Sequence, residues 1–319
     1  ISARLKRIKV KPLPKVSAGL SLSGDLLEFT VSAEGMSGEE LAEILGRYER
    51  KKKYFRLKNG DFIQPDEGLE TLAEIMERFD LSAEMMTADS VKLPKFRAME
   101  LDGMLKEDES VAVDRARSFK SLIRDMKNVE DNDYDVPKSL KGVLRGYQTR
   151  GFLWLKTLNA CGFGGILADD MGLGKTLQVI AFLLSSYQEG IYQKPTLIVC
   201  PASLIYNWES EIRRFAPELK TRMILGTAKE REEQIAGIDG GDVCITSYDL
   251  LRRDMQAYEN TKFACQVIDE AQHIKNHSTK AAKAVKSIQA GFHLALTGTP
   301  VENRLSELWS IFDYLMPGL

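Results

Sequence analysis

The sequence has little cysteine and no pattern typical of a metal centre or a disulfide framework. Its cysteines lie far apart without a C-x-x-C pair, and three of them sit within or beside apolar, strand-like runs. The three histidines also lack ligand spacing, so we expect no zinc. Buried free thiols are the prediction for the cysteines, with zinc or disulfides as the alternative. These residues are Cys161, Cys200, Cys244, Cys265, His273, His277 and His293.

Long apolar runs and an excess of charge of one sign are also missing. No stretch approaches the roughly 20 apolar residues that a membrane span needs, so no membrane partner is expected. The net charge is −2, so any binding to nucleic acid depends on local basic patches. The chain starts at Ile1 without a signal-like segment, and we interpret it as a piece of a longer protein.

The 319 residues favour two domains, of which the first has mixed α+β patterning. Residues 20–32 alternate apolar and polar side chains, which predicts a first hairpin, and Ser37 with Glu40 forms a capping-box pattern before a helix. An Asn59-Gly60 turn predicts a second hairpin, followed by helical spacing over residues 67–79. We therefore predict an α+β accessory domain over residues 1–127 and an acidic linker over residues 128–138.

From residue 139 onward, short β-branched runs alternate with helical patterns, as in a parallel sheet covered by helices on both faces. Helical stretches at residues 176–187 and 278–288 have the length of crossover helices. The second domain, residues 139–319, is therefore predicted to be α/β. Six strands are predicted, at residues 164–168, 196–201, 222–226, 242–248, 264–270 and 293–299.

A glycine-rich turn between a predicted strand and a helix, ADDMGLGKT, has the context of a phosphate-binding loop. Gly172 and Gly174 let backbone N–H groups approach phosphate, Lys175 supplies a positive charge, and Thr176 offers a hydroxyl group to Mg²⁺. The general motif has glycine where this sequence has Asp169. A glycine turn that merely begins an ordinary helix is the alternative. We expect the loop residues Asp170, Met171, Gly172, Leu173, Gly174, Lys175 and Thr176 to bind ATP.

A second acidic motif follows an apolar run in QVIDEAQHIKN. Strands of an open α/β sheet deliver ligand-facing residues at their carboxyl ends, where Asp269 and Glu270 are predicted to lie. Asp269 is expected to hold Mg²⁺ and Glu270 to polarise the attacking water, which together with Lys175 gives the predicted catalytic set. An acidic pair alone is more often part of a solvated loop. The pair supports a nucleotide site here because it follows the Lys175 loop along the sequence.

Six blocks in order resemble the first RecA-like lobe of the Swi/Snf family of superfamily-two ATPases, over residues 140–319. They are LRGYQTRGFLWL, ADDMGLGKT, LIVCPASLIYNWESEI, ITSYDLLRRD, DEAQHIKN and LTGTPVENRLSELWSIFDYLMPG. Phosphate loops of this family commonly read D-D/E-M-G-L-G-K-T, which accommodates Asp169. Residues 1–127 resemble, less specifically, the accessory region that precedes the motor in bacterial members.

The resemblance assigns the adenine edge of ATP to Gln148, with Arg145 near it. An exposed helix start is the alternative for this glutamine. The resemblance also places the blocks that contain Ser203, Thr246 and Ser247 along the backbone of double-stranded DNA. Ser203 is expected to cap a helix, and Trp208 to pack beneath that helix rather than to stack on bases.

Thr297, Gly298 and Thr299 match the family's third motif, which links hydrolysis to nucleic acid and to a second lobe. A tight turn before Pro300 is the alternative. Gln272 stands where many relatives have histidine, which favours a bacterial member. The resemblance also implies that arginines from a second lobe, absent from this chain, complete the ATPase, so hydrolysis by these residues alone should be weak.

The resemblance implies an ATP- and Mg²⁺-dependent motor that translocates on duplex DNA and remodels protein–DNA complexes. The location expected is the cytoplasm, with the bacterial nucleoid, or the nucleus for a eukaryotic source. Two alternatives stay open: a strand-separating helicase and a catalytically silent binding module. The basic stretches at residues 3–15 and 47–58 are interpreted as solvated, with DNA or partner contact as the alternative.

Overall fold

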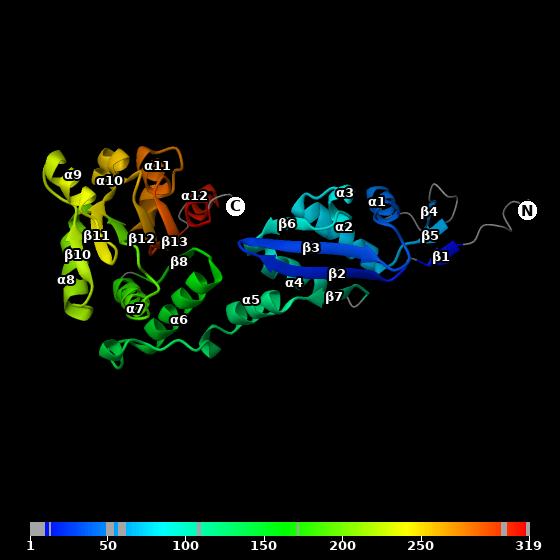
Figure 1. Ribbon diagram of the computed structural model, residues 1–319, viewed down its shortest axis with the longest axis horizontal. Helices are drawn as coiled ribbons and strands as arrows, with labels where there is room; N and C mark the ends of the chain where they lie inside the picture. The colour runs from blue at the N-terminus through cyan, green and yellow to red at the C-terminus, as the bar shows by residue number, and fades with distance from the viewer. Residues whose placement is uncertain are drawn as a thin grey trace, which may run out of the picture. The chain divides into compact units, whose positions relative to one another are not determined.

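The computed structural model describes residues 10–12, 14–48, 54–56, 62–106, 110–170, 172–300 and 305–316. The chain divides into two compact units, residues 1–124 and 125–319 (Figure 1). This division falls inside the helix α5 (Arg117–Lys127), close to the end of the accessory domain predicted at residue 127. Within the described residues, no helix has the length and apolar character that a bilayer span requires.

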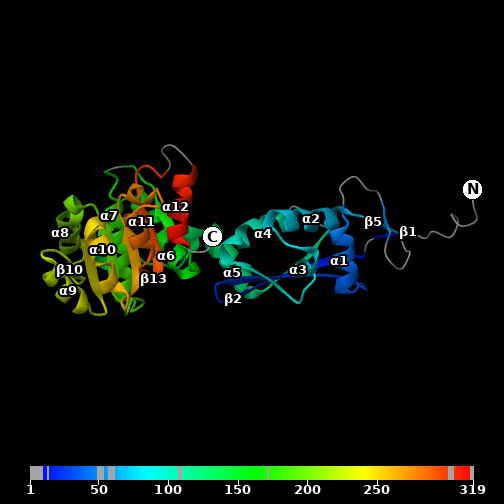
Figure 2. The same cartoon turned by 90° about the horizontal axis from the view of Figure 1, so that it is seen from above.

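The first unit is built on a four-stranded sheet in the order β6-β3-β2-β7. The predicted first hairpin is confirmed, because β2 and β3 pair antiparallel and turn at Gly24, whose φ is +60°. Figure 2 shows α2 and α4 over one face of this sheet. The strands are β2 (Val16–Ser23), β3 (Leu26–Ala33), β6 (Val91–Pro94) and β7 (Ala112–Arg115). The helices are α1 (Gly38–Gly46), α2 (Glu67–Phe79), α3 (Ala83–Met86) and α4 (Ala98–Lys106).

Two further predictions for this unit are confirmed. The Ser37 hydroxyl accepts from the Glu40 N–H at 3.2 Å while the Glu40 carboxylate accepts from the Ser37 N–H at 3.1 Å, which is the predicted capping box. A small sheet, β1 (Val10–Pro12), β5 (Phe62–Gln64) and β4 (Phe55–Arg56), contains the second hairpin. The Asn59-Gly60 turn and most of the two basic stretches lie outside the described residues.

The second unit contains a six-stranded sheet in which every pair of neighbours is parallel, in the order β10-β11-β9-β12-β13-β8. All six predicted strands are present. The central ones are fully buried because helices cover both faces, which explains their continuous apolar sequences. The strands are β8 (Gly165–Leu167), β9 (Thr196–Cys200), β10 (Lys220–Met223), β11 (Asp242–Ser247), β12 (Lys262–Ile268) and β13 (Gln289–Leu296).

The helices of the second unit form two layers. The layer packed on Leu197 and Val199 includes α9 (Ala228–Ala236), α10 (Tyr248–Asp254), α11 (Lys280–Lys286) and α12 (Leu305–Leu315). The other contains α6 (Gly146–Cys161), α7 (Lys175–Gln188) and α8 (Ile205–Phe215), of which α6 and α8 both contact α7. The α/β fold predicted from residue 139 is confirmed, and the four cysteines, all within the described residues, are buried and form no disulfide.

The segment predicted as an acidic linker packs against α6. Asn132 donates from Nδ2 to the Thr157 hydroxyl at 2.8 Å, and the Lys156 ammonium lies 5.4 Å from the centre of the Tyr134 ring. Lys156 is buried and is paired with Glu189 at 2.7 Å. Residues 128–137 thus form a strap on the second unit, held by polar groups that a composition-based interpretation as linker overlooks.

Candidate active site

The candidate site lies at the carboxyl ends of three adjacent strands. β8, β13 and β12 are neighbours, and they lead into the loops that carry Lys175, Thr297 and Asp269, respectively. The Thr297 N–H donates to the Leu167 carbonyl at 3.3 Å, which joins the loops after β13 and β8. Sheet topology therefore brings together three motifs that are far apart in sequence, at the edge where open α/β sheets bind ligands.

The phosphate loop has the backbone shape that an anion site requires. Gly172 and Gly174 have φ of +84° and +73°, in the left-handed region that favours glycine. A Cβ on Gly174 would also lie 2.5 Å from Gln148 Nε2. The 14-residue α7 begins directly after it, so its unpaired N–H groups and dipole favour a phosphate there. Met171 lies outside the described residues.

Lys175 and Asp169 are tied to the loop's own groups. The Lys175 ammonium donates to the carbonyls of Asp169 at 2.7 Å and Asp170 at 3.3 Å. The Asp169 carboxylate accepts from Nε2 of the buried Gln178 at 2.7 Å. The residue that departs from the general motif is thus bonded to α7, a connection that a glycine could not make.

Gln148 supports the phosphate loop from α6. It is buried, its Oε1 accepts from the Arg145 N–H at 2.9 Å, and its Nε2 donates to the Leu173 carbonyl at 3.1 Å. The alternative of an exposed helix start is therefore wrong for Gln148, while its contact with adenine stays a prediction. Tyr147 donates to the same Leu173 carbonyl at 2.9 Å, a role that our sequence analysis missed although Tyr147 directly precedes Gln148.

Asp269 is 8% exposed, and donors hold both of its carboxylate oxygens. Its Oδ2 accepts from Trp208 Nε1 at 2.9 Å, and its Oδ1 accepts from the Glu270 N–H at 2.9 Å. Burial raises the pKa of this carboxyl group, while the bonds from Trp208 and Glu270 and the charge of Lys175 act in the opposite direction. Each oxygen keeps a lone pair for a cation.

The side chains available fit Mg²⁺. Carboxylate and hydroxyl oxygens are the hard ligands that this ion uses, and it usually keeps several waters. Asp269 supplies an oriented carboxylate, and Thr176 is partly exposed at the second position of α7, directly after Lys175. These two are the residues that would hold the ion, directly or through water.

A chain of hydrogen bonds joins Glu270 to the third motif. Glu270 has φ of +52°, a conformation uncommon outside glycine, and its Oε2 accepts from Gln272 Nε2 at 2.8 Å. Gln272 Oε1 accepts from the Thr297 hydroxyl at 3.2 Å, and that hydroxyl accepts from the Thr299 N–H at 3.1 Å. Gly298 lies between these two threonines. The loops after β12 and β13 are therefore connected by side chains, beyond a simple tight turn before Pro300.

The expectation that Ser203 caps α8 is wrong. Ser203 is exposed within a 3-10 turn, Ala202–Leu204, and the residue that precedes α8 is Leu204, which has helical φ and ψ. A capping side chain needs an extended residue at that point, and here the 3-10 turn leads directly into the helix. Trp208 is fully buried, as predicted, and its bond to Asp269 was not foreseen.

The segment after β11 begins with a cap that was not predicted. The Ser247 hydroxyl accepts from the Leu250 N–H at 3.3 Å and so caps α10, although Ser247 is 3% exposed. Thr246 is completely buried. The predicted involvement of both residues with DNA remains a prediction.

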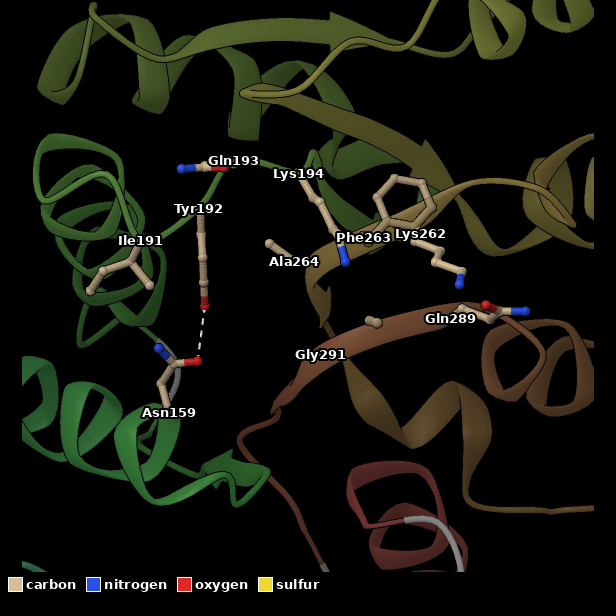
Figure 3. A pocket seen from close by; sticks show the side chains of 11 residues that line it. Asn159, Ile191, Tyr192, Gln193, Lys194, Lys262, Phe263, Ala264, Gln289 and Gly291 are labelled. Atoms are coloured by element: carbon tan, nitrogen blue, oxygen red, sulfur yellow. Dashed lines mark hydrogen bonds between the residues drawn. The ribbon is translucent and has the colours of Figure 1, made fainter. Parts of the chain in front are cut away.

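A separate hollow of about 680 Å³ lies at the opposite edge of the sheet (Figure 3). Residues 191–194, which precede β9, and the first residues of β12 and β13 line it. Tyr192 donates to Asn159 Oδ1 across one side at 3.2 Å. None of the predicted site residues lines this hollow, so the candidate site is the set of loops at the carboxyl edge.

Comparison with known proteins gives two family matches. The family described as "SNF2-related domain" matches residues 147–319, and the one described as "Bacterial SNF2 helicase associated" matches residues 1–137.

Similar curated proteins are much longer than this chain. The putative ATP-dependent helicase/translocase YwqA of Bacillus subtilis is 40% identical over 65% of this chain and 23% of its own length. An uncharacterized ATP-dependent helicase of Mycoplasma genitalium is 34% identical over 93% of this chain and 29% of its own length. The TATA-binding protein-associated factor MOT1 of Saccharomyces cerevisiae is 40% identical over 67% of this chain and 12% of its own length. The chain therefore spans less than a third of each of these relatives.

Among solved structures, the Sulfolobus solfataricus SWI2/SNF2 ATPase core in complex with double-stranded DNA is similar, with a TM-score of 0.51. It is 41% identical and covers 59% of this chain and 38% of its own.

Proposed function

Because this chain belongs to the Swi/Snf family of ATPases, we propose that it carries the first, ATP-binding lobe of a motor that translocates on duplex DNA and remodels protein–DNA complexes. The bonded sequence Glu270–Gln272–Thr297–Thr299 beside the Lys175 loop is the observation that carries the proposal. It connects the groups that would act on ATP with the motif that would respond to DNA. The similar SWI2/SNF2 core bound to DNA supports duplex DNA as the partner.

In this proposal, the phosphate loop binds the triphosphate of ATP. The N–H groups around Gly172 and Gly174 would donate hydrogen bonds to the β-phosphate, and the Lys175 ammonium would exchange the Asp169 and Asp170 carbonyls for phosphate oxygens. A charged phosphate is the stronger acceptor, so this exchange is favourable. Gln148 and Arg145 would lie toward the adenine, and Leu173 and Met171 would belong to the ATP-binding loop.

The carboxylates of Asp269 and Glu270 would have different roles, the first in binding the metal ion and the second in orienting water. Asp269 and Thr176 would hold Mg²⁺, which when bound neutralises charge on the phosphates. Glu270 would accept a hydrogen bond from the attacking water and orient it, with Gln272 fixing one of its carboxylate oxygens. The segments that would respond to the DNA backbone contain Ser203, Thr246, Ser247 and Gly298.

Hydrolysis by these residues alone should be weak. The resemblance assigns γ-phosphate arginines to a second lobe, and such arginines typically contribute about 10³ to 10⁵ in rate. The two predicted domains, residues 1–127 and 139–319, would act as accessory domain and motor lobe. We propose a bacterial cytoplasm with its nucleoid as the location, or the nucleus for a eukaryotic source.

The test is an ATPase assay on a protein that continues through the second lobe. We expect stimulation by duplex DNA and its loss in Lys175→Ala, whereas Lys194→Ala, an exposed lysine at the opposite edge, should leave it intact. Equal stimulation by single-stranded RNA would support a strand-separating helicase instead. No stimulation by any nucleic acid, together with no Mg²⁺-dependent binding of ATP, would support a silent binding module.

A further inference from the structure

Two aromatic side chains from different helices converge on Asp269. Trp208 of α8 donates from Nε1 to the carboxylate Oδ2 at 2.9 Å. Tyr248, the first residue of α10, donates from its hydroxyl group to the Asp269 carbonyl at 2.7 Å. Trp208 is 0% exposed and Tyr248 is 6% exposed, so water does not compete for either bond. The side chain and the backbone of one residue are thus each held by a buried donor.

The bond from Trp208 determines where the carboxylate points. The second oxygen, Oδ1, accepts from the Glu270 N–H at 2.9 Å, so a donor on each oxygen opposes rotation of the carboxylate group. Hydrogen bonds to ionised acceptors are stronger than neutral ones, and a low local dielectric strengthens them further. Without the indole N–H, Oδ2 loses its described donor and the carboxylate can turn.

The bond from Tyr248 fixes the turn that carries the carboxylate. The Tyr248 ring stacks on His273, with ring centres 4.8 Å apart and planes inclined by 23°. The Asp269 N–H also donates to the Val199 carbonyl at 2.8 Å, so the backbone at Asp269 is held on both its donor and its acceptor side. Tyr248 therefore anchors the start of the loop after β12.

Both helices extend from the surface to this residue. On α8, the side chain of Tyr206 is 66% exposed, two residues before the buried Trp208. On α10, Asp249 is exposed next to the buried Tyr248. A displacement of either helix at the surface would therefore move a donor of Asp269.

We propose that Trp208 and Tyr248 are positioning residues that hold Asp269 for Mg²⁺, so that α8 and α10 set the affinity of the site for the ion. This inference rests on the proposed function, in which Asp269 carries the cation. Residues that orient a metal ligand typically contribute about 10- to 100-fold to metal affinity or activity. Trp208 has the larger effect because it holds the ligand oxygen itself, while Tyr248 holds the backbone.

The experiment measures ADP binding to the 319-residue chain by calorimetry, in EDTA and at graded Mg²⁺ concentrations. For Trp208→Phe, the Mg²⁺ concentration at half-maximal effect should rise by about tenfold or more, with a smaller rise for Tyr248→Phe. ADP binding in EDTA should stay within about twofold of the wild type, because the positioning residues hold Asp269 rather than the phosphate loop. Matched controls are Trp309→Phe and Tyr187→Phe, whose side chains are exposed and which should leave the Mg²⁺ dependence unchanged.

Tyr248→Phe removes a single oxygen atom and keeps the inference testable if Trp208→Phe does not fold. An unchanged Mg²⁺ midpoint in the folded variants would overturn it. If a variant loses both ADP binding in EDTA and thermal stability, the inference is also overturned, because that result indicates that the substitution disturbs the packing of the whole unit. If ADP binding by the wild type does not respond to Mg²⁺, the proposed assignment of the ion to Asp269 is wrong. If the wild type responds and the variants have the same Mg²⁺ midpoint, only the positioning role of Trp208 and Tyr248 is wrong.

Discussion

The Thr297 hydroxyl donates to Gln272 Oε1 at 3.2 Å and thereby joins the loops that follow two adjacent strands, β13 and β12. Gln272 simultaneously donates to Glu270, so one amide group contacts both the predicted water-orienting carboxylate and the third motif. A movement of Thr297 would therefore reach Glu270 through a single side chain.

Gln272→Ala should lower the DNA-stimulated ATPase rate of the protein that includes the second lobe by about tenfold or more. The alanine removes both bonds, so Glu270 would no longer be held in place when Thr297 shifts. ATP binding by calorimetry should change little, because the phosphate loop is untouched. Gln256→Ala, at an exposed position, is the matched control. A normal stimulated rate in Gln272→Ala would contradict this prediction.

Gln148→Ala should weaken ATP binding by about tenfold, since a partly buried hydrogen bond to the loop is lost and the Leu173 carbonyl keeps only Tyr147 as a described partner. Calorimetry with ATP and GTP separates two causes. A loss for ATP alone would support contact with adenine, and an equal loss for both would indicate support of the loop. Gln188→Ala, exposed at the end of α7, serves as the control, and unchanged affinities in Gln148→Ala would refute both causes.

Glu189→Gln should destabilise the second unit by about 1 to 2 kcal/mol, because it leaves the buried Lys156 ammonium without its charged partner. The estimate is below the value for a fully buried pair because the Glu189 side chain is 42% exposed. Urea unfolding measures the change, and Glu218→Gln, on the surface, is the control. Equal midpoints for both variants would show that Lys156 does not depend on this carboxylate.

Stability should fall as the pH decreases from about 6.5 to about 4 because of His293. Burial lowers its pKa to about 4 in the folded state, compared with about 6.5 in an unfolded chain. Between these values the unfolded chain binds more protons, so the free energy of unfolding decreases on acidification, by about 3 kcal/mol at most.

His293→Phe should remove this component of the pH dependence, while His277→Phe, at an exposed site, should preserve it. Denaturant unfolding at pH 7 and at pH 4.5 measures the difference between the two variants. An identical pH dependence in His293→Phe and in the wild type would argue against a partly buried, neutral histidine at this position.

The sequence by itself determined the second unit's fold class and the order of its motifs. Six short apolar runs predicted six strands because a buried parallel strand must be apolar on both faces. Local chemistry also predicted the capping box of Ser37 and the glycines of the phosphate loop, since caps and positive φ depend on neighbouring residues.

Only the tertiary structure decided which distant side chains meet. The bond from Trp208 to Asp269 spans 61 residues and has no sequence period, because it arises from the packing of α8 against the sheet. The strap over residues 128–137 is likewise held by Thr157 and Lys156, which acidic composition does not reveal. The sequence also failed to predict the conformation at Ser203, where a 3-10 turn stands in place of the expected cap. Local patterns fix the elements, whereas contacts between them depend on how the sheet orders its strands.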